Sequence, residues 1–306
     1  MMYALARLTA RNWKVFVKDR ANVFFALLAP LIVLALYVLF LGRIQIDGLL
    51  AGLEEAGLPS DGEVEEAVRA FCDSWMLVGT VASACITVPL CACGIMISDK
   101  SRGISADYLA SPIPRWLPPA SYFCAVVFAG LVIGGAVLAV CLVWLAVSGS
   151  WFLTALDVLG CVGTLVLSVL ASSTLLVFVV GFFRSQGAFT GLNVIFGTVV
   201  GFLIGAYMPV TYFPLGVQYF TLLIPGTYSA GLFRNFMMRG ALENVAASLP
   251  APAGDIFADE LAEQFSMTFD FFGAAEVGPA VMAGVLAGAF VLFGALCLLS
   301  SALRRK

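Results

Sequence analysis

WMLVGTVASACITVPLCACGIMI, residues 75–97, is an uninterrupted stretch without Asp, Glu, Lys or Arg. About 20 such residues cross the hydrocarbon core, because a helix rises about 1.5 Å per residue and the core is about 30 Å thick. Five more segments have this character, and all 35 charged residues can be placed outside the six. A charge at mid-span would cost at least about 2.5 kcal/mol. The pattern predicts an all-α integral membrane protein whose spans are residues 22–42, 75–97, 120–147, 158–183, 189–207 and 281–301.

Composition agrees with this class and excludes several chemistries. Charged residues make up 11% of the chain, against about 25% in soluble domains. The sequence contains no histidine, which excludes a Ser-His-Asp triad, His-based proton transfer and His metal ligands. Most of the eight cysteines fall inside predicted spans, where free Cys behaves as a small apolar residue. We therefore expect neither a disulfide framework nor a metal site.

The basic residues predict the orientation. Segments 1–21, 98–119, 184–188 and 302–306 carry 12 Lys and Arg against three acids, whereas the opposite face carries four against sixteen. By the positive-inside rule both termini are cytoplasmic, in a plasma or inner membrane. The first apolar run is too long for the apolar core of a secretory signal peptide, so we interpret it as a retained span.

Residues 1–20 precede the first span and have helical periodicity. Arg7, Arg11, Lys14 and Lys18 share one face, and Leu5, Trp13 and Phe16 lie opposite. The pattern predicts an amphipathic helix on the cytoplasmic leaflet, with an ordinary charged flank as the alternative. After the first span, residues 43–74 form a predicted acidic external loop. Within that loop Ser60 and Glu63 have capping-box spacing, which predicts a short helix leading into the second span.

The stretch MPVTYFPLGVQYFTLLIPGTYSAGLFR, residues 208–234, is apolar but is broken by Pro209, Pro214 and Pro225. A seventh span here would place the basic C-terminus outside. We therefore expect short re-entrant helices in the outer interface, where protein or water satisfies the interrupted backbone. An acidic external loop follows, and the whole external segment covers residues 208–278.

Polar and small residues inside the spans are candidates for a substrate pathway or a helix interface. The second span carries Thr80, Ser83 and Thr87 near one face, with Pro89 in its interior. The fifth carries Gly197, Gly201 and Gly205 at four-residue spacing, with Asn193 one turn earlier. Small residues at this spacing permit close helix contact. Packing within one bundle, a subunit interface and a pathway lining all remain open for both sets.

Nucleotide chemistry cannot reside in this chain by the common phosphate loop, because no Lys follows a Gly. Coupling to an ion gradient is disfavoured, since no ionisable residue has to lie in mid-membrane. The cytoplasmic loop 98–119, SDKSRGISADYLASPIPRWLPP, contains a predicted helix over residues 104–110. That helix should stop at Ser111, which precedes Pro112. A rigid helix in this place would suit a partner protein as a lever.

The order of these elements resembles the type-2 ATP-binding-cassette exporter permease family over nearly the whole chain. The proline-broken segment resembles the re-entrant pair of that family, and the loop resembles its coupling helix. The resemblance implies that the loop docks on an ATPase subunit. The corresponding residues are Arg102, Gly103, Asp107, Tyr108, Ser111 and Pro112. The family commonly has Glu before this glycine and Gly-Thr after it, whereas this chain has Asp99, Arg102 and Gly103-Ile104.

The resemblance further implies a single permease domain over residues 1–306 that exports an amphipathic molecule such as a drug, lipid or glycoconjugate. It implies no catalytic residue and no cofactor in this chain, because ATP and Mg²⁺ belong to the ATPase. The implied partners are ATPase subunits, a second permease as homodimer or heterodimer, and membrane lipid, with no nucleic acid. A non-transporting scaffold or assembly factor and an ion-coupled carrier are the alternatives.

Overall fold

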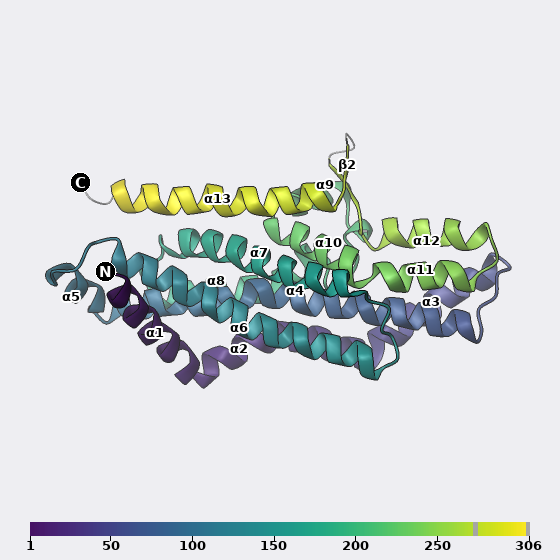
Figure 1. The fold of residues 1–306 in the computed structure, drawn as a ribbon, viewed down its shortest axis with the longest axis horizontal. Helices are drawn as coiled ribbons and strands as arrows, with labels where there is room; N and C mark the ends of the chain where they lie inside the picture. Colours follow the sequence, from purple (N-terminus) through teal and green to yellow (C-terminus); the bar gives the residue numbers. More distant parts are fainter. Residues whose placement is uncertain (272–274, 304–306) are drawn as a thin grey trace.

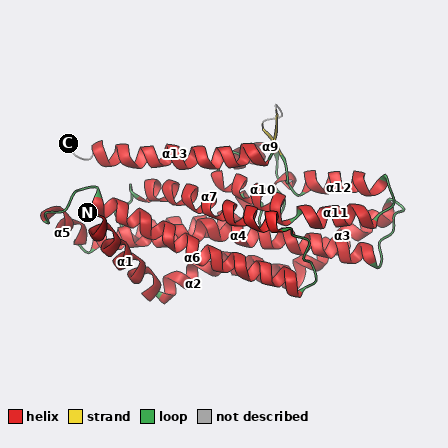
Figure 2. Cartoon of the chain, viewed as in Figure 1, coloured by secondary structure: helices red, strands yellow, loops and turns green. Residues whose placement is uncertain are grey.

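The computed structural model describes residues 1–271 and 275–303, and almost all of them are helical (Figures 1 and 2). The predicted number of spans is confirmed, since six helical segments of the described chain are long and apolar enough to cross a membrane. They are Pro30–Glu55, Glu63–Ser101, Leu117–Val147, Ala155–Val180, Gln186–Leu203 and Pro279–Ser300.

Helix α4 (Glu63–Ser101) is the central element of the bundle. Its 39 residues reach about 58 Å, well beyond the thickness of a bilayer, and its middle is buried on all sides. It packs against α6 (Leu117–Val147), α2 (Arg20–Leu36), α7 (Ala155–Val180) and α8 (Gln186–Leu203). A Cβ on Gly79 would lie 2.9 Å from the carbonyl oxygen of Ala206, so this glycine lets the neighbouring backbone come close.

The first span differs from the prediction. After α2 the chain makes a π-helical turn (Tyr37–Leu41) and continues as α3 (Gly42–Glu55), so much of the predicted external loop 43–74 is helix. Arg43 does not end the helix, because an exposed charge is compatible with helical backbone; the break comes at Gly57, whose φ is +70°. The capping-box prediction was wrong. The N-cap of α4 is Gly62, and the hydroxyl of Ser60 donates to Glu54 at 2.8 Å.

Helix α1 (Met2–Lys18) forms as predicted, and it packs against α6 as well as preceding the first span. Phe16 is buried, and the Trp13 ring meets Phe128 edge-on with centroids 4.9 Å apart. α1 lies at the same end of the elongated bundle as α5 (Ile104–Ala110) and the C-terminal end of α13 (Pro279–Leu303) (Figure 1). The other end carries α3, α11 (Arg239–Ser248) and α12 (Ala253–Gln264).

Each of the three prolines in residues 208–234 stands at the start of a helical segment. Pro209 is the N-cap of the 3-10 turn Val210–Tyr212, Pro214 is the N-cap of α9 (Leu215–Thr221), and Pro225 is the first residue of α10 (Pro225–Met237). Proline suits these positions because its missing N–H leaves no helical hydrogen bond unmade. Beyond α12, strands β1 (Phe269–Phe271) and β2 (Ala275–Val277) pair antiparallel, which the all-α prediction did not include.

Candidate functional site

Helix α5 has the bounds predicted from the sequence. Gly103, with φ +80°, turns the chain away from α4, and Ser111 ends α5 in an extended conformation immediately before Pro112. The hydroxyl of Ser111 donates to the carbonyl of Tyr108 at 2.8 Å, which closes the last turn. α5 is therefore a short helix held between two tight turns at one end of the 39-residue α4.

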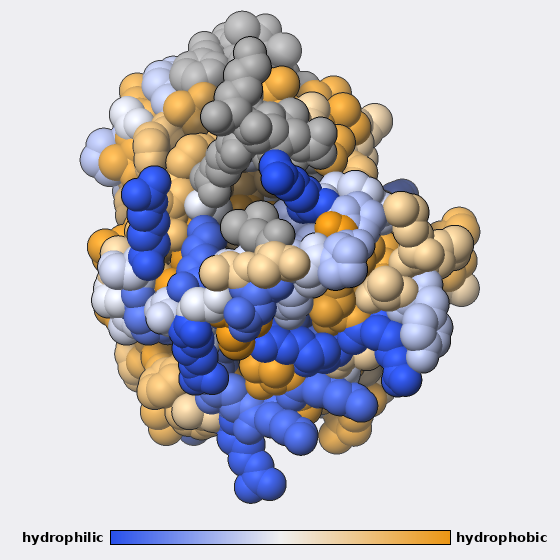
Figure 3. Space-filling model, turned by 90° about the vertical axis from the view of Figure 1, so that its left-hand side faces the viewer, coloured by the Kyte–Doolittle hydropathy of each residue, from blue (hydrophilic) through white to orange (hydrophobic). Residues whose placement is uncertain are grey.

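The remaining residues assigned to the coupling loop differ in their exposure. Arg102, Asp107 and Pro112 are exposed, whereas Tyr108 is half-buried against the core. Figure 3 looks onto this end of the molecule, where hydrophilic side chains gather in the middle and toward the lower edge, with apolar side chains to both sides. No atom of the described chain lies within 4 Å of the place that a Cβ on Gly103 would occupy, so steric contact does not require a glycine here. The positive φ does, because glycine adopts it without strain.

A charged cluster next to α5 ties three helices together. Arg11 of α1 makes a two-pronged ion pair with Asp99, near the C-terminal end of α4. Tyr122 of α6 donates to the same carboxylate at 2.6 Å. Asp99 is 3% exposed, and its hydrogen bond raises the pKa of Arg11. A buried carboxylate with three such bonds has a fixed position, so α1 and α6 are joined to α4 three residues before Arg102.

A second contact strengthens this junction. Asn12 is buried, and its amide donates to the hydroxyl of Ser121 at 3.2 Å, close to Tyr122 on the first turns of α6. The oxygen of the Asn12 side-chain amide accepts a hydrogen bond from Arg11 at 2.9 Å. We call Arg11, Asn12, Asp99, Ser121 and Tyr122 the junction cluster. Because its members come from α1, α4 and α6, a displacement of the end of α4 would also displace α1 and α6.

The polar residues of the second span are packed between helices in this conformation. Thr80, Ser83 and Thr87 are all buried. Thr80 donates to the carbonyl of Met76 at 3.0 Å, one turn back, as hydroxyls inside helices commonly do. Thr87 donates to the carbonyl of Ala26 at 2.8 Å and so bridges α4 to α2. These contacts support bundle packing within one chain.

The glycine series of the fifth span is not one continuous helix face. α8 ends at Leu203, short of the predicted Tyr207, and Gly205 follows it with φ +70°, the conformation that glycine favours after a helix. A Cβ on Gly201 would lie 2.2 Å from the Tyr207 ring, while one on Gly197 would meet nothing within 4 Å. Asn193 is half-buried and its amide lies 3.4 Å from the Cys91 sulfur of α4.

Arg234 of α10 is buried, although the sequence analysis assigned it to the external loops. It is 1% exposed. Its guanidinium donates to the carbonyls of Ile204 at 3.0 Å, Gly205 at 2.9 Å and Ser266 at 3.2 Å. The first two carbonyls directly follow α8, where the helix dipole favours a cation. Ser266 has a positive φ of 56°, so Arg234 also fixes a strained turn.

Local sequence patterns contain only part of this information. Arg234 interrupts an apolar run, and that interruption could have marked it as an interior residue. The pairing of Arg11 with Asp99 spans 88 positions and has no local signature. Within residues 1–271 and 275–303, no three His, Cys, Asp or Glu side chains gather to hold a metal ion. All eight cysteines are free thiols.

The fold defines a multi-pass membrane protein with a short helix projecting between its second and third spans. Residues 3–238 match the family described as ABC-2 type transporter, which covers more than half of the chain. The chain therefore belongs to the ABC-2 type transporters and is the membrane permease component, without an ATPase domain in its sequence. No curated protein sequence matches it.

Proposed function

We propose that the chain is the transmembrane permease of an ATP-driven exporter and that a separate ATPase subunit docks on α5. The observation that carries the proposal is the position of α5 at the end of α4, the most deeply buried helix of the bundle. A displacement of α5 would be transmitted along the continuous helix α4 toward the opposite end of the bundle. Arg102, Asp107 and Pro112 are exposed there for a partner to contact.

The junction cluster gives this coupling a mechanical basis. Asp99 is fixed by Arg11 and Tyr122, so the end of α4 does not move independently of α1 and α6. Nucleotide binding in the ATPase would thus reorient several helices together, as interconversion between inward- and outward-facing states requires. α5 would face the cytosol, in agreement with the excess of basic residues on that face.

A second permease and an amphipathic cargo complete the proposal. α8 exposes large apolar side chains, among them Val194, Ile195 and Phe202, for lipid or for a second copy or paralogue. Asn193 and Gly197 lie on this helix and are the residues we assign to the interface or to the pathway. Drugs, lipids and glycoconjugates all combine apolar and polar parts. A route lined by apolar and weakly polar side chains would suit such an amphipathic cargo.

Co-purification tests the docking. We expect the tagged chain, extracted from its native membrane, to bring a P-loop ATPase with it. Asp107→Lys reverses an exposed charge on α5 and should reduce the recovered ATPase several-fold without changing the elution of the folded chain. Asp61→Lys is the matched control, since Asp61 is exposed in the turn before α4, at the opposite end. Recovery of assembly proteins without any ATPase, or equal ATPase with Asp107→Lys, would contradict the proposal.

A further inference from the structure

Pro30 lies inside α2 and leaves one backbone carbonyl without its helical donor. Proline has no N–H, so the carbonyl of Ala26, one helical turn earlier, cannot accept the usual hydrogen bond. Ala26 is buried, and a buried carbonyl needs a donor from the protein or from ordered water. The hydroxyl of Thr87 on α4 donates to this carbonyl at 2.8 Å. The second span therefore supplies the hydrogen bond that the proline removes from the first.

A second side-chain contact joins the same two spans further out. Tyr37 is buried at the start of the π-helical turn, and its hydroxyl donates to Asp73 of α4 at 3.2 Å. Ser150, between α6 and α7, donates to the same carboxylate at 3.4 Å. Residues 27–36 are all apolar, so they offer no side-chain hydrogen bond between the two contacts. The outer half of the first span is thus joined to α4 through polar groups at Ala26 and at Tyr37.

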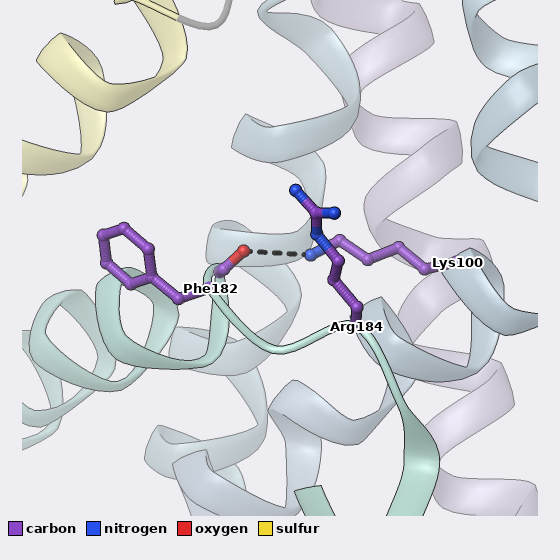
Figure 4. Close-up of a pocket in the computed structure, with 4 residues that line it drawn as sticks. Lys100, Phe182 and Arg184 are labelled. Atoms are coloured by element: carbon purple, nitrogen blue, oxygen red, sulfur yellow. Dashed lines mark hydrogen bonds between the residues drawn. The ribbon is translucent and has the colours of Figure 1, made fainter. Parts of the chain in front are cut away.

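The first span has fewer neighbours than α4 has. α2 packs mainly against α4, and its side chains Leu31 and Ile32 are exposed, where lipid would lie. The C-terminal end of α4 is held by the junction cluster and by Lys100, whose ammonium donates to the carbonyls of Gly181 at 3.1 Å and Phe183 at 3.3 Å. Figure 4 shows the Lys100 side chain reaching across to the segment that follows α7. The first span is therefore the less constrained of the two helices.

We propose that the first span bends at Pro30 during transport and that Thr87 is a positioning residue, which holds the span in the conformation of this structure. Inside a helix, proline is a common cause of a sharp bend. The carbonyl of Ser83, in the same helix as Thr87, lies 3.1 Å from the Thr87 hydroxyl and is a second acceptor. When the two spans change their angle, Thr87 releases Ala26 and keeps an acceptor. The hinge rests on the proposed function, because movement of α4 by a docked ATPase would drive the bend.

A double-mutant cycle on the purified full chain tests the contact. Pro30→Ala returns an N–H to the helix, so the Ala26 carbonyl no longer needs Thr87. Thr87→Val should lower the unfolding temperature of the parent by about 2–5 °C, because a buried carbonyl is left unpaired, but should have little effect in the Pro30→Ala chain. Thr174→Val is the matched control and should change little, since this buried hydroxyl donates to carbonyls of its own helix, α7. Equal losses with Thr87→Val in both backgrounds would overturn the proposal.

ATP hydrolysis by the complex of the chain with its co-purified ATPase, in proteoliposomes, tests the hinge itself. We expect Pro30→Ala to keep its fold and its ATPase yet to lower kcat about tenfold with KM for ATP unchanged, which corresponds to about 1.4 kcal/mol of added barrier. Thr87→Val should lower kcat as well, because the span returns less readily to the held conformation. Thr87→Ser keeps the hydroxyl and should restore kcat.

Two outcomes of this assay are distinguishable failures. Equal kcat for the parent and for Pro30→Ala, with both complexes faster than the ATPase alone, would contradict the hinge and leave the exporter intact. A parent complex that is no faster than the ATPase alone would instead contradict the proposed function on which the hinge rests.

Discussion

Arg234→Met is expected to lower the thermal unfolding temperature of the purified chain by about 5 °C or more. The methionine is similar in length but donates nothing to Ile204, Gly205 and Ser266, whose carbonyls all accept from the guanidinium. Each lost charge-assisted hydrogen bond is worth about 1.5–3 kcal/mol. The variant no longer buries a charge, which offsets several kcal/mol of that loss. We expect a net destabilisation of about 2–4 kcal/mol.

Two further variants make this test specific. Arg239→Met removes another arginine from the next turn, where it is 70% exposed and pairs with the exposed Glu243, so the unfolding temperature should barely change. Arg234→Lys keeps the charge but lacks the fork that reaches several carbonyls, so its effect should be intermediate. A parent-like unfolding temperature for Arg234→Met, measured by a thermal melt in detergent, would show that these contacts do not hold the segment after α8.

Asp99→Arg is expected to abolish coupling between the ATPase and the permease. The substitution places a second cation against Arg11 in a site where Asp99 is 3% exposed. Removing one partner of a buried ion pair costs about 3–5 kcal/mol, and we expect about 2 kcal/mol here because the Arg11 side chain is 34% exposed. The readouts are the unfolding temperature of the chain and ATP hydrolysis by the complex it forms.

The double variant Arg11→Asp/Asp99→Arg should restore at least half of both readouts, since the pair is then re-formed with opposite polarity. Glu65→Arg supplies the control on the same helix, where an exposed ion pair with Arg69 is lost and little should change. If the double variant performs no better than Asp99→Arg alone, the two residues do not act as a pair and the junction cluster loses its proposed role.

The membrane-spanning architecture was predictable from the sequence because the bilayer imposes a constraint that is local in the chain. Each span needs about 20 apolar residues, whatever its neighbours are. α5 was predictable for a similar reason, since Gly103 and Pro112 limit a helix at both ends by their own backbone preferences. The first span was misjudged at its outer end. Helical hydrogen bonds persist beyond the membrane, so the charge of Arg43 did not mark a boundary.

Residues whose role depends on distant partners were not predictable. Helical periodicity grouped Arg11 with Lys14 and Lys18 on one basic face, but only the packing of α1 beside α4 selects Arg11 for Asp99. Gly205 fits the four-residue spacing of the glycine series, yet it follows the end of α8 and adopts a positive φ. Spacing shows which residues share a face only as long as the helix continues.

ATP hydrolysis in proteoliposomes is the most direct test of the central claim, that a separate ATPase drives this permease through α5. The preparations to compare are the chain alone, its co-purified ATPase alone, and the two together. We predict no hydrolysis by the chain alone, because it lacks a phosphate-binding loop. The assembled complex should hydrolyse ATP faster than the ATPase alone, even after an ionophore has dissipated ion gradients, and the Asp107→Lys complex should not. Hydrolysis that persists in the purified chain, or an ATPase rate that the parent chain leaves unchanged, would contradict the account.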